Sequence, residues 1–195
     1  MMTFAPEPEA AGPLPGPSVV DGEEAALIRD AVAGNVRAFG VIVRTHQGRV
    51  FNFLRQMTRH QQDAEDLAQQ TFIKAHQNLA RFDPRRPLVN WLLTIARNTA
   101  LNHFRDVKKW DEIPDGAASH DPSPARQAED REQKENLWSR ARALLSPREF
   151  EVLWLRFGED MSTRETAQVV GLTETHVKVI IFRARQALMK GVKHA

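Results

Sequence analysis

Apolar residues recur at spacings of three and four along most of this chain, and this period restricts what it can fold into. The clearest series is Phe39, Ile42, His46, Val50, Phe53 and Met57. Such spacing is typical of the buried stripe of an amphipathic helix. No stretch alternates convincingly with a period of two, which a half-buried strand needs. The sequence therefore predicts an all-α fold.

The helical pattern falls into two blocks, which predicts two small helical domains joined by a flexible linker. Helices are expected at about 23–33, 39–57, 63–79 and 89–109, and again from near Arg131, with Ser146 and Pro147 starting a further helix. Asp63 is the expected N-cap of the third helix. The fourth helix is expected to bury Trp91, Leu92, Ile95, Leu101 and Phe104.

The segments outside these helices have a different composition. Residues 1–22 are rich in proline, alanine and glycine, which predicts a disordered tail. Residues 110–135 carry eight acids against three bases, with three prolines, which is typical of a linker. The predicted units are thus 1–22, 23–109, 110–135 and 136–195.

The composition excludes several classes of function. The chain has no cysteine, so disulfides, thiolate metal sites and cysteine nucleophiles are absent. Its seven histidines show no metal-ligand spacing, and His46 fits a core position. No metal or cofactor is expected. No apolar run of 18 residues and no signal peptide occurs, which predicts a cytoplasmic protein without membrane insertion.

Basic residues concentrate in two places. Residues 81–109 hold seven bases against two acids, and residues 174–195 hold five against one, although the net charge of the chain is only +2. Two basic blocks on either side of an acidic connector indicate two contacts with a polyanion. Ordinary solvated faces would explain the same charges equally well.

The segment "MSTRETAQVVGLTETHVKVIIFRARQAL" carries the most specific local signal. Ser162 and Glu165 have the spacing of a capping box, Gly171 stands where a helix ends in a left-handed residue, and Thr173 caps the next helix. This pattern predicts a helix-turn-helix. The alternative is a helical hairpin that binds nothing.

The exposed side of the second helix of this motif fits the reading of duplex DNA. Its N-terminal residues would enter a major groove, and its arginines further along could reach phosphates. The candidates are Arg164, Thr173, Glu174, Thr175, His176, Lys178, Val179, Arg183 and Arg185.

Two stretches of the sequence resemble regions of a known protein family. "LSPREFEVLWLRF" with the helix-turn-helix resembles region 4 of bacterial sigma factors, and "DAEDLAQQTFIKAHQNLARFDPRRPLVNWLLTIARNTALNHFR" resembles region 2. The chain is similar to the extracytoplasmic-function group of the sigma-70 family. The resemblance implies a sigma factor without enzymatic activity. It would bind core RNA polymerase and promoter DNA, under the control of an anti-sigma factor.

The resemblance gives the helix at 63–79 a partner. In the family this helix docks on a coiled coil of the largest polymerase subunit, and the flap of the second-largest subunit is a further contact. The corresponding residues are Asp63, Glu65, Asp66, Gln69, Gln70 and Ile73. Gln70 departs from the family, which usually has an acid there. Paired carboxylates holding a metal are a weaker alternative, because no second acidic motif accompanies them.

The first basic block resembles the family's −10 element binding segment. There a loop captures a flipped base, and the following helix holds the opened strand. The candidates are Arg85, Arg86, Asn90, Arg97, Asn98, Asn102, Arg105, Lys108 and Lys109. Asn102 stands where the family often has an aspartate. Trp91 could stack on a base, although its periodic position favours the core.

Two other functions remain open. A sigma mimic would sequester an anti-sigma factor without touching DNA, and would not need Lys178, Arg183 and Arg185. A polymerase-independent helix-turn-helix regulator would have no use for the polar strip around Asp66. The acidic linker could imitate nucleic acid or act as a solvated spacer.

Overall fold

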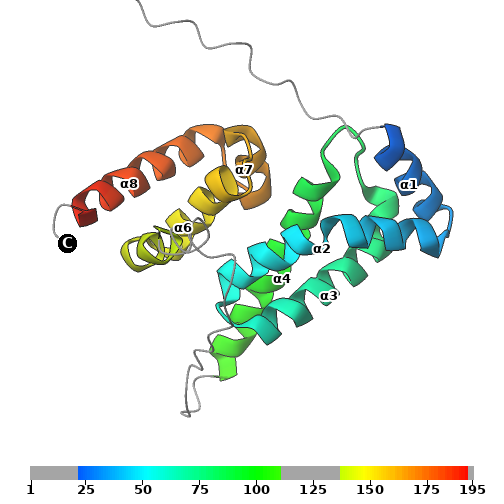
Figure 1. The fold of residues 1–195 in the computed structure, drawn as a ribbon, viewed down its shortest axis with the longest axis horizontal. Helices are drawn as coiled ribbons and strands as arrows, with labels where there is room; N and C mark the ends of the chain where they lie inside the picture. The colour runs from blue at the N-terminus through cyan, green and yellow to red at the C-terminus, as the bar shows by residue number, and fades with distance from the viewer. Residues whose placement is uncertain (1–21, 111–136, 193–195) are drawn as a thin grey trace, which may run out of the picture.

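A computed structural model describes residues 22–110 and 137–192 of the chain. All regular structure in these two ranges is helical, which confirms the prediction of an all-α fold (Figure 1). Residues 1–21 of the predicted tail, almost all of the predicted linker and the helix start near Arg131 lie outside the described residues, whereas Gly22, also assigned to the tail, is the first residue of a helix. Within the two described ranges, no helix is long and apolar enough to cross a membrane.

The first unit is a bundle in which α2, α3 and α4 pack on one another and α1 packs on α2. Its elements are α1 (Gly22–Val32), α2 (Val36–Thr58), α3 (Gln61–Asn78), the 3-10 turn η1 (Leu79–Arg81) and α4 (Leu88–Trp110). Of the apolar stripe predicted for α2, Ile42, His46, Val50 and Phe53 are buried, and Phe39 and Met57 are partly buried against the same core. His46 is part of this core and pairs through Nε2 with Glu24 Oε1 at 2.8 Å.

Two local predictions for this unit were wrong. The N-cap of α3 is His60, whose Nδ1 accepts a hydrogen bond from the backbone N–H of Asp63. The chain turns sharply at Arg59, which has a φ of 61°, so the helix can begin before Asp63. Leu101 is 41% exposed instead of buried, because it lines a pocket between the two halves of the molecule.

The second unit contains the predicted helix-turn-helix. It consists of a helix at 137–144, α6 (Pro147–Leu153), a π turn η2 (Trp154–Gly158), α7 (Thr163–Val170) and α8 (Glu174–Val192). Capping boxes form at Ser146 and at Ser162, and Gly171 ends α7 with a φ of 69°. The turn between α7 and α8 needs this left-handed residue, which glycine adopts without a steric penalty.

The two units pack directly against each other through α4 and α7. One cluster of buried apolar side chains runs through both, and includes Leu92 and Ala96 of the first unit and Val152 and Val169 of the second. A smaller cluster around Phe150 belongs to the second unit alone. The expectation of two domains on a tether did not include this contact.

Candidate nucleic-acid and polymerase interfaces

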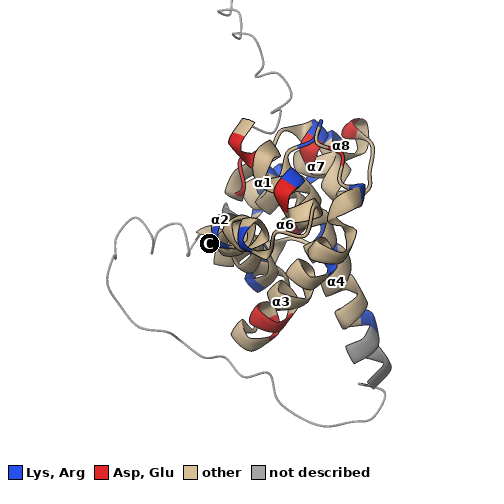
Figure 2. Ribbon diagram, turned by 90° about the vertical axis from the view of Figure 1, so that its right-hand side faces the viewer, with Lys and Arg blue, Asp and Glu red and all other residues tan. Residues whose placement is uncertain are grey.

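The polar residues of α3 form an exposed strip, and its acidic members are visible as red ribbon on α3 (Figure 2). The buried side of α3 consists of Ala64, Leu67, Thr71, Phe72 and Ala75. The acidic strip, as we name it, consists of Asp63, Glu65, Asp66, Gln69, Gln70 and Ile73. All of these are exposed except Asp63, which is partly exposed. A large apolar side chain, Ile73, is 53% exposed among carboxylates and amides. Such a mixture suits a partner with basic and apolar groups.

Glutamines one turn earlier orient the carboxylates of the acidic strip. Gln61 donates from Nε2 to Glu65 Oε1 at 2.9 Å, and Gln62 donates from Nε2 to Asp66 Oδ1 at 3.4 Å. These pairs have the i,i+4 spacing at which helix side chains meet. Each carboxylate accepts one amide and retains further lone pairs that a partner can use.

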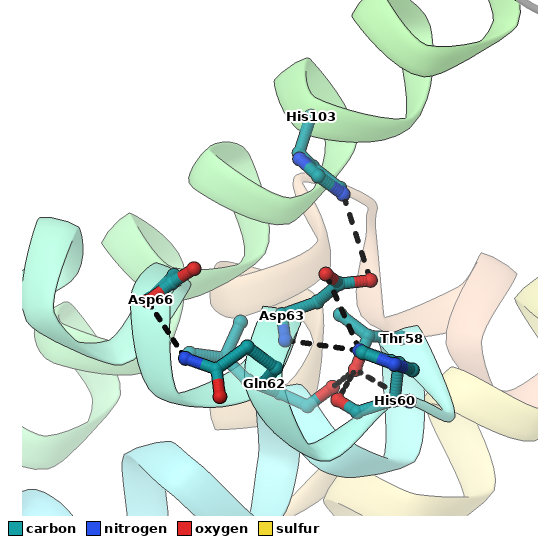
Figure 3. Close-up of polar contacts among 7 residues, drawn as sticks. Thr58, His60, Gln62, Asp63, Asp66 and His103 are labelled. Carbon is teal, nitrogen blue, oxygen red and sulfur yellow. Dashed lines mark hydrogen bonds and ion pairs between the residues drawn. The ribbon is translucent and has the colours of Figure 1, made fainter. Parts of the chain in front are cut away.

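Asp63 lies between two imidazoles at the start of α3 (Figure 3). Its Oδ1 is 3.4 Å from Nδ1 of His60, and its Oδ2 is 3.9 Å from Nε2 of His103 on α4. Thr58 supports His60 by accepting its backbone N–H at 3.3 Å. The first turn of the acidic strip is therefore oriented by both α2 and α4. In the part of the chain that the structure describes, no group of three or more His, Cys, Asp or Glu could hold a metal ion.

The predicted −10 residues divide into an exposed group and a buried pair. Arg85 and Arg86 lie exposed on the loop before α4, and Asn98, Asn102 and Arg105 are exposed on α4 itself. The side chains of Lys108 and Lys109 lie outside the described residues. The exposed group places amide and guanidinium donors along one helix and its preceding loop, as a nucleic-acid backbone requires.

The loop arginines are held by Asp83. Arg85 donates from Nε and Nη2 to the two carboxylate oxygens at 2.9 and 3.0 Å, and its backbone N–H donates to Oδ1 at 3.1 Å. Hydrogen bonds from the Arg85 side chain and backbone lower the pKa of Asp83, and the same carboxylate raises the pKa of Arg85. The charge of Asp83 thus fixes the position of one of the two cations that the loop offers.

Asn90 and Arg97 face the second unit instead of solvent. Arg97 Nε donates to Glu151 Oε1 of α6 at 2.5 Å, and Asn90 Nδ2 donates to Glu165 Oε1 of α7 at 3.1 Å. Only 7% of Arg97 and 6% of Asn90 are exposed. Their role in holding DNA stays a prediction, and in this arrangement their donors are occupied by carboxylates.

The face of α8 that is predicted to read DNA is exposed. Val177, Ile180 and Ala184 are buried and anchor the helix. The exposed candidates are Arg164 on α7, Thr173 in the turn, and Glu174, Thr175, His176, Lys178, Val179, Arg183 and Arg185 on α8. Thr173 Oγ1 accepts the backbone N–H of His176 at 3.2 Å. The cap therefore fixes the start of the helix that would enter a groove.

The structure adds Arg156, Phe157 and Phe182 to this surface. The guanidinium carbons of Arg156 and Arg185 lie 5.1 and 5.2 Å from the centre of the Phe157 ring, which is a cation–π distance. Phe182 is 63% exposed on α8. Sequence reasoning missed these residues, because the contact between Phe157 and Arg185 joins segments separated by the whole of α7.

Several arginines surround a pocket between the two units. This pocket, of about 480 Å³, is lined by Phe53 of α2, by Arg59 directly after α2, by Leu101 of α4, and by Arg142 and Trp154 of the second unit, among others. Burial lowers the pKa of Arg142 to about 10, and repulsion from Arg59 and Arg55 acts in the same direction. Arg142 reaches across to donate to the backbone and side-chain oxygens of Gln56.

Known proteins share both units of this chain. Residues 42–110 match the family model of sigma-70 region 2, and residues 137–188 match that of sigma-70 region 4. RNA polymerase sigma factor CnrH of Cupriavidus metallidurans is 33% identical over 174 residues, which cover 83% of this chain and 90% of CnrH. ECF RNA polymerase sigma factor BldN of Streptomyces coelicolor is 31% identical over 170 residues. The chain belongs to the ECF sigma factors of the sigma-70 family. The match covers 84% of this sigma factor and 64% of the length of BldN.

Solved structures agree with this assignment. CnrH in complex with the cytosolic domain of CnrY has a TM-score of 0.65 and 28% identity to this sigma factor, over 88% of this chain and 98% of CnrH. Sigma factor RpoE in complex with the anti-sigma factor NepR from Bartonella quintana has a TM-score of 0.63 at 23% identity, and so shares the fold. It covers 81% of this chain and 98% of RpoE. The expected resemblance is confirmed, and the two helical units correspond to regions 2 and 4.

Proposed function

We propose that this sigma factor binds core RNA polymerase through the acidic strip and directs it to promoters with two DNA-binding surfaces. The observation that carries the proposal is the presence, in one chain, of an exposed acidic strip on α3 and an exposed basic face on α8. A DNA-binding regulator without a polymerase partner would need only the second of these surfaces.

Each surface has a distinct task in the proposal. The exposed face of α8 contacts the −35 element in the major groove, with base edges read near Thr175 and Lys178 and phosphates held by Arg183 and Arg185. The loop with Arg85 and Arg86, and the donors of α4, hold the opened strand of the −10 element. Melting then draws on binding energy, because the captured strand offsets the cost of unstacking. The chain itself breaks no covalent bond.

A protein partner that restrains the sigma factor is the second part of the proposal. CnrH was solved in complex with the cytosolic domain of CnrY, which supports a partner of this kind for a relative with the same two regions. The exposed apolar side chain of Ile73 in the acidic strip is a contact that such an anti-sigma factor could share with polymerase. Activity is proposed to take place in the cytoplasm, together with the polymerase.

Run-off transcription tests the proposal directly. Purified protein is mixed with sigma-free bacterial core polymerase and a library of genomic promoter fragments. We expect discrete transcripts that depend on the protein and share two upstream sequence elements. If the protein neither bound core polymerase nor produced transcripts, the proposal would fail, and a mimic that sequesters an anti-sigma factor would be the better hypothesis.

A further inference from the structure

Phe157 is a large apolar side chain that the structure leaves open to solvent next to α8. It is 45% exposed, whereas Leu155, two residues earlier, is fully buried. Both residues belong to the π turn η2, which directly follows α6. Single π turns are frequent at functional sites. An isolated apolar side chain on a surface is ordinary, so the contacts of this ring decide whether it has a task.

Two guanidinium groups from different elements meet at the ring of Phe157. The guanidinium carbon of Arg156, in η2, lies 5.1 Å from the ring centre, and that of Arg185, in α8, lies 5.2 Å from it. The faces of an aromatic ring carry negative charge density, so they attract cations at such distances. One uncharged side chain therefore keeps two positive charges close to a single point on the surface of region 4.

The charges of these two arginines are only weakly compensated by the protein. Arg156 Nη1 lies 4.0 Å from Oδ1 of Asp160, whose side chain is fully exposed. An exposed ion pair contributes little, because water and salt screen it. Within residues 22–110 and 137–192, no carboxylate pairs with Arg185. The ring thus holds both cations without neutralising them, which leaves them available to an anion.

We propose that Phe157 is a positioning residue for DNA binding, whose ring places Arg156 and Arg185 against the phosphate backbone beside the −35 element. The inference rests on the proposed role of α8 in binding this element. A guanidinium that stacks on a ring keeps its N–H donors at its edge, so it can stack and bind a phosphate at once. An arginine that is already held also loses less side-chain freedom when DNA binds.

The contribution of the two arginines is measured first. The probe is a fluorescein-labelled DNA duplex of mixed sequence, because phosphate contacts do not depend on sequence. Fluorescence anisotropy gives its affinity for the full chain without polymerase, from low to moderate salt. Arg156→Gln and Arg185→Gln should each reduce the slope of log affinity against log salt by about 0.9, since each removes one phosphate contact.

Two substitutions of Phe157 test the ring itself. Phe157→Leu keeps an apolar side chain but removes the ring, so the affinity should fall about three- to tenfold. Phe157→Tyr retains the ring and should bind like the parent protein. Circular dichroism of both variants checks that the helices are retained.

The carboxylate of Asp160 is the other group that could place Arg156. Asp160→Asn removes its charge, and asparagine tolerates the φ of 53° at this position as aspartate does. The affinity should not fall in this variant, because the ring and not the carboxylate holds the arginine.

A combination of substitutions separates positioning from a direct or a purely structural role of Phe157. In a protein that already carries Arg156→Gln and Arg185→Gln, the ring has no cation to hold. Phe157→Leu should then cause no further loss of affinity. A ring that touched DNA itself, or that only stabilised region 4, would lower the affinity to the same extent with and without the two arginines.

Several results would overturn the proposal. These are parent-like affinity of Phe157→Leu, an equal loss in Phe157→Tyr, an undiminished effect of Phe157→Leu without the two arginines, a loss in Asp160→Asn, or an unchanged salt slope in both arginine variants. Arg183→Ala distinguishes this failure from failure of the proposed function. If Arg183→Ala still weakened binding, α8 would bind DNA without the help of Phe157. If the parent protein did not bind the duplex at low salt, the proposed role of α8 would fail as well.

Discussion

The guanidinium of Arg97 and the carboxylate of Glu151 meet at 2.5 Å across the boundary between regions 2 and 4. The two residues are separated by 54 positions in the chain and lie in different family regions. A residue that the family resemblance assigns to DNA is thus engaged by an acid of the same protein. If Arg97 binds promoter DNA as predicted, this pairing would link that binding to the relative position of the two regions.

Replacement of Asp66 by arginine should weaken binding to core polymerase while the fold is retained. Asp66 is exposed on the acidic strip, so the change places a positive charge where a basic partner surface is expected. We expect an affinity loss of at least tenfold, about 1.4 kcal/mol, in a binding assay with labelled core polymerase.

Gln47→Arg, on an exposed position of α2, is the control for an added charge on a helix of the same unit. Unchanged circular dichroism of both variants would show that the fold is intact. Equal affinity of Asp66→Arg and the parent protein would favour a regulator that works without polymerase.

Replacement of Lys178 and replacement of Arg183 by alanine should affect DNA binding in different ways. Lys178 lies near the start of α8, where base edges are expected, so Lys178→Ala should cost about 1–3 kcal/mol and relax sequence preference at one position. Arg183→Ala should weaken binding to all sequences and reduce the salt slope by about 1.

Fluorescence anisotropy with −35 duplexes, over a range of salt concentrations, separates the two effects. Gln168→Ala, an exposed change on α7, is the control. The same uniform loss in Lys178→Ala and Arg183→Ala would contradict the assignment of Lys178 to base edges.

Replacement of Gly171 and of Gly48 by alanine should change the free energy of unfolding in opposite directions. Gly171 has a φ of 69°, and an added Cβ would meet no atom within 4 Å. The only loss of stability on substitution therefore comes from the strained left-handed backbone conformation. We expect Gly171→Ala to lower the free energy of unfolding by about 1 kcal/mol. Gly48 lies within α2, also with open space around it, so Gly48→Ala should raise stability by about 0.5–1 kcal/mol. Thermal melts compare both variants, and a gain from Gly171→Ala would contradict the left-handed turn.

Glu165 should make stability depend on pH in the acidic range. Burial raises its pKa, but hydrogen bonds from Ser162 and Asn90 outweigh this and lower it from the usual 4.5. The folded state therefore binds fewer protons than the unfolded state. The stabilisation is complete above about pH 4.5 and is lost as the pH falls through the lower folded value.

Glu165→Gln keeps a side chain that can complete the capping box, so it isolates the effect of the charge. Its melting temperature should fall less steeply than that of the parent between about pH 5 and 3. Asp160→Asn controls for removal of an exposed carboxylate. Parallel curves for Glu165→Gln and the parent would refute the assignment.

Much of each region could be predicted because its signals are local. Capping boxes, the glycine at the end of α7 and the apolar stripe of α2 depend on residues within one or two turns, and the structure has all of them. The start of α3 was predicted wrongly, because His60 can accept the capping hydrogen bond only after the chain turns at Arg59. Leu101 was assigned to the core because periodicity gives the face of a helix but not the extent to which neighbouring helices cover it.

The sequence by itself determined the helices, the helix-turn-helix and the surfaces that face outwards on α3 and α8, because helix period and capping act over a few residues. Only the tertiary structure decided that Asn90 and Arg97 face region 4. Their partners, Glu165 and Glu151, lie 75 and 54 positions away. A buried donor needs an acceptor, but residue spacing does not reveal which distant carboxylate supplies it. The packing of the second unit on α4 brings these two carboxylates to Asn90 and Arg97.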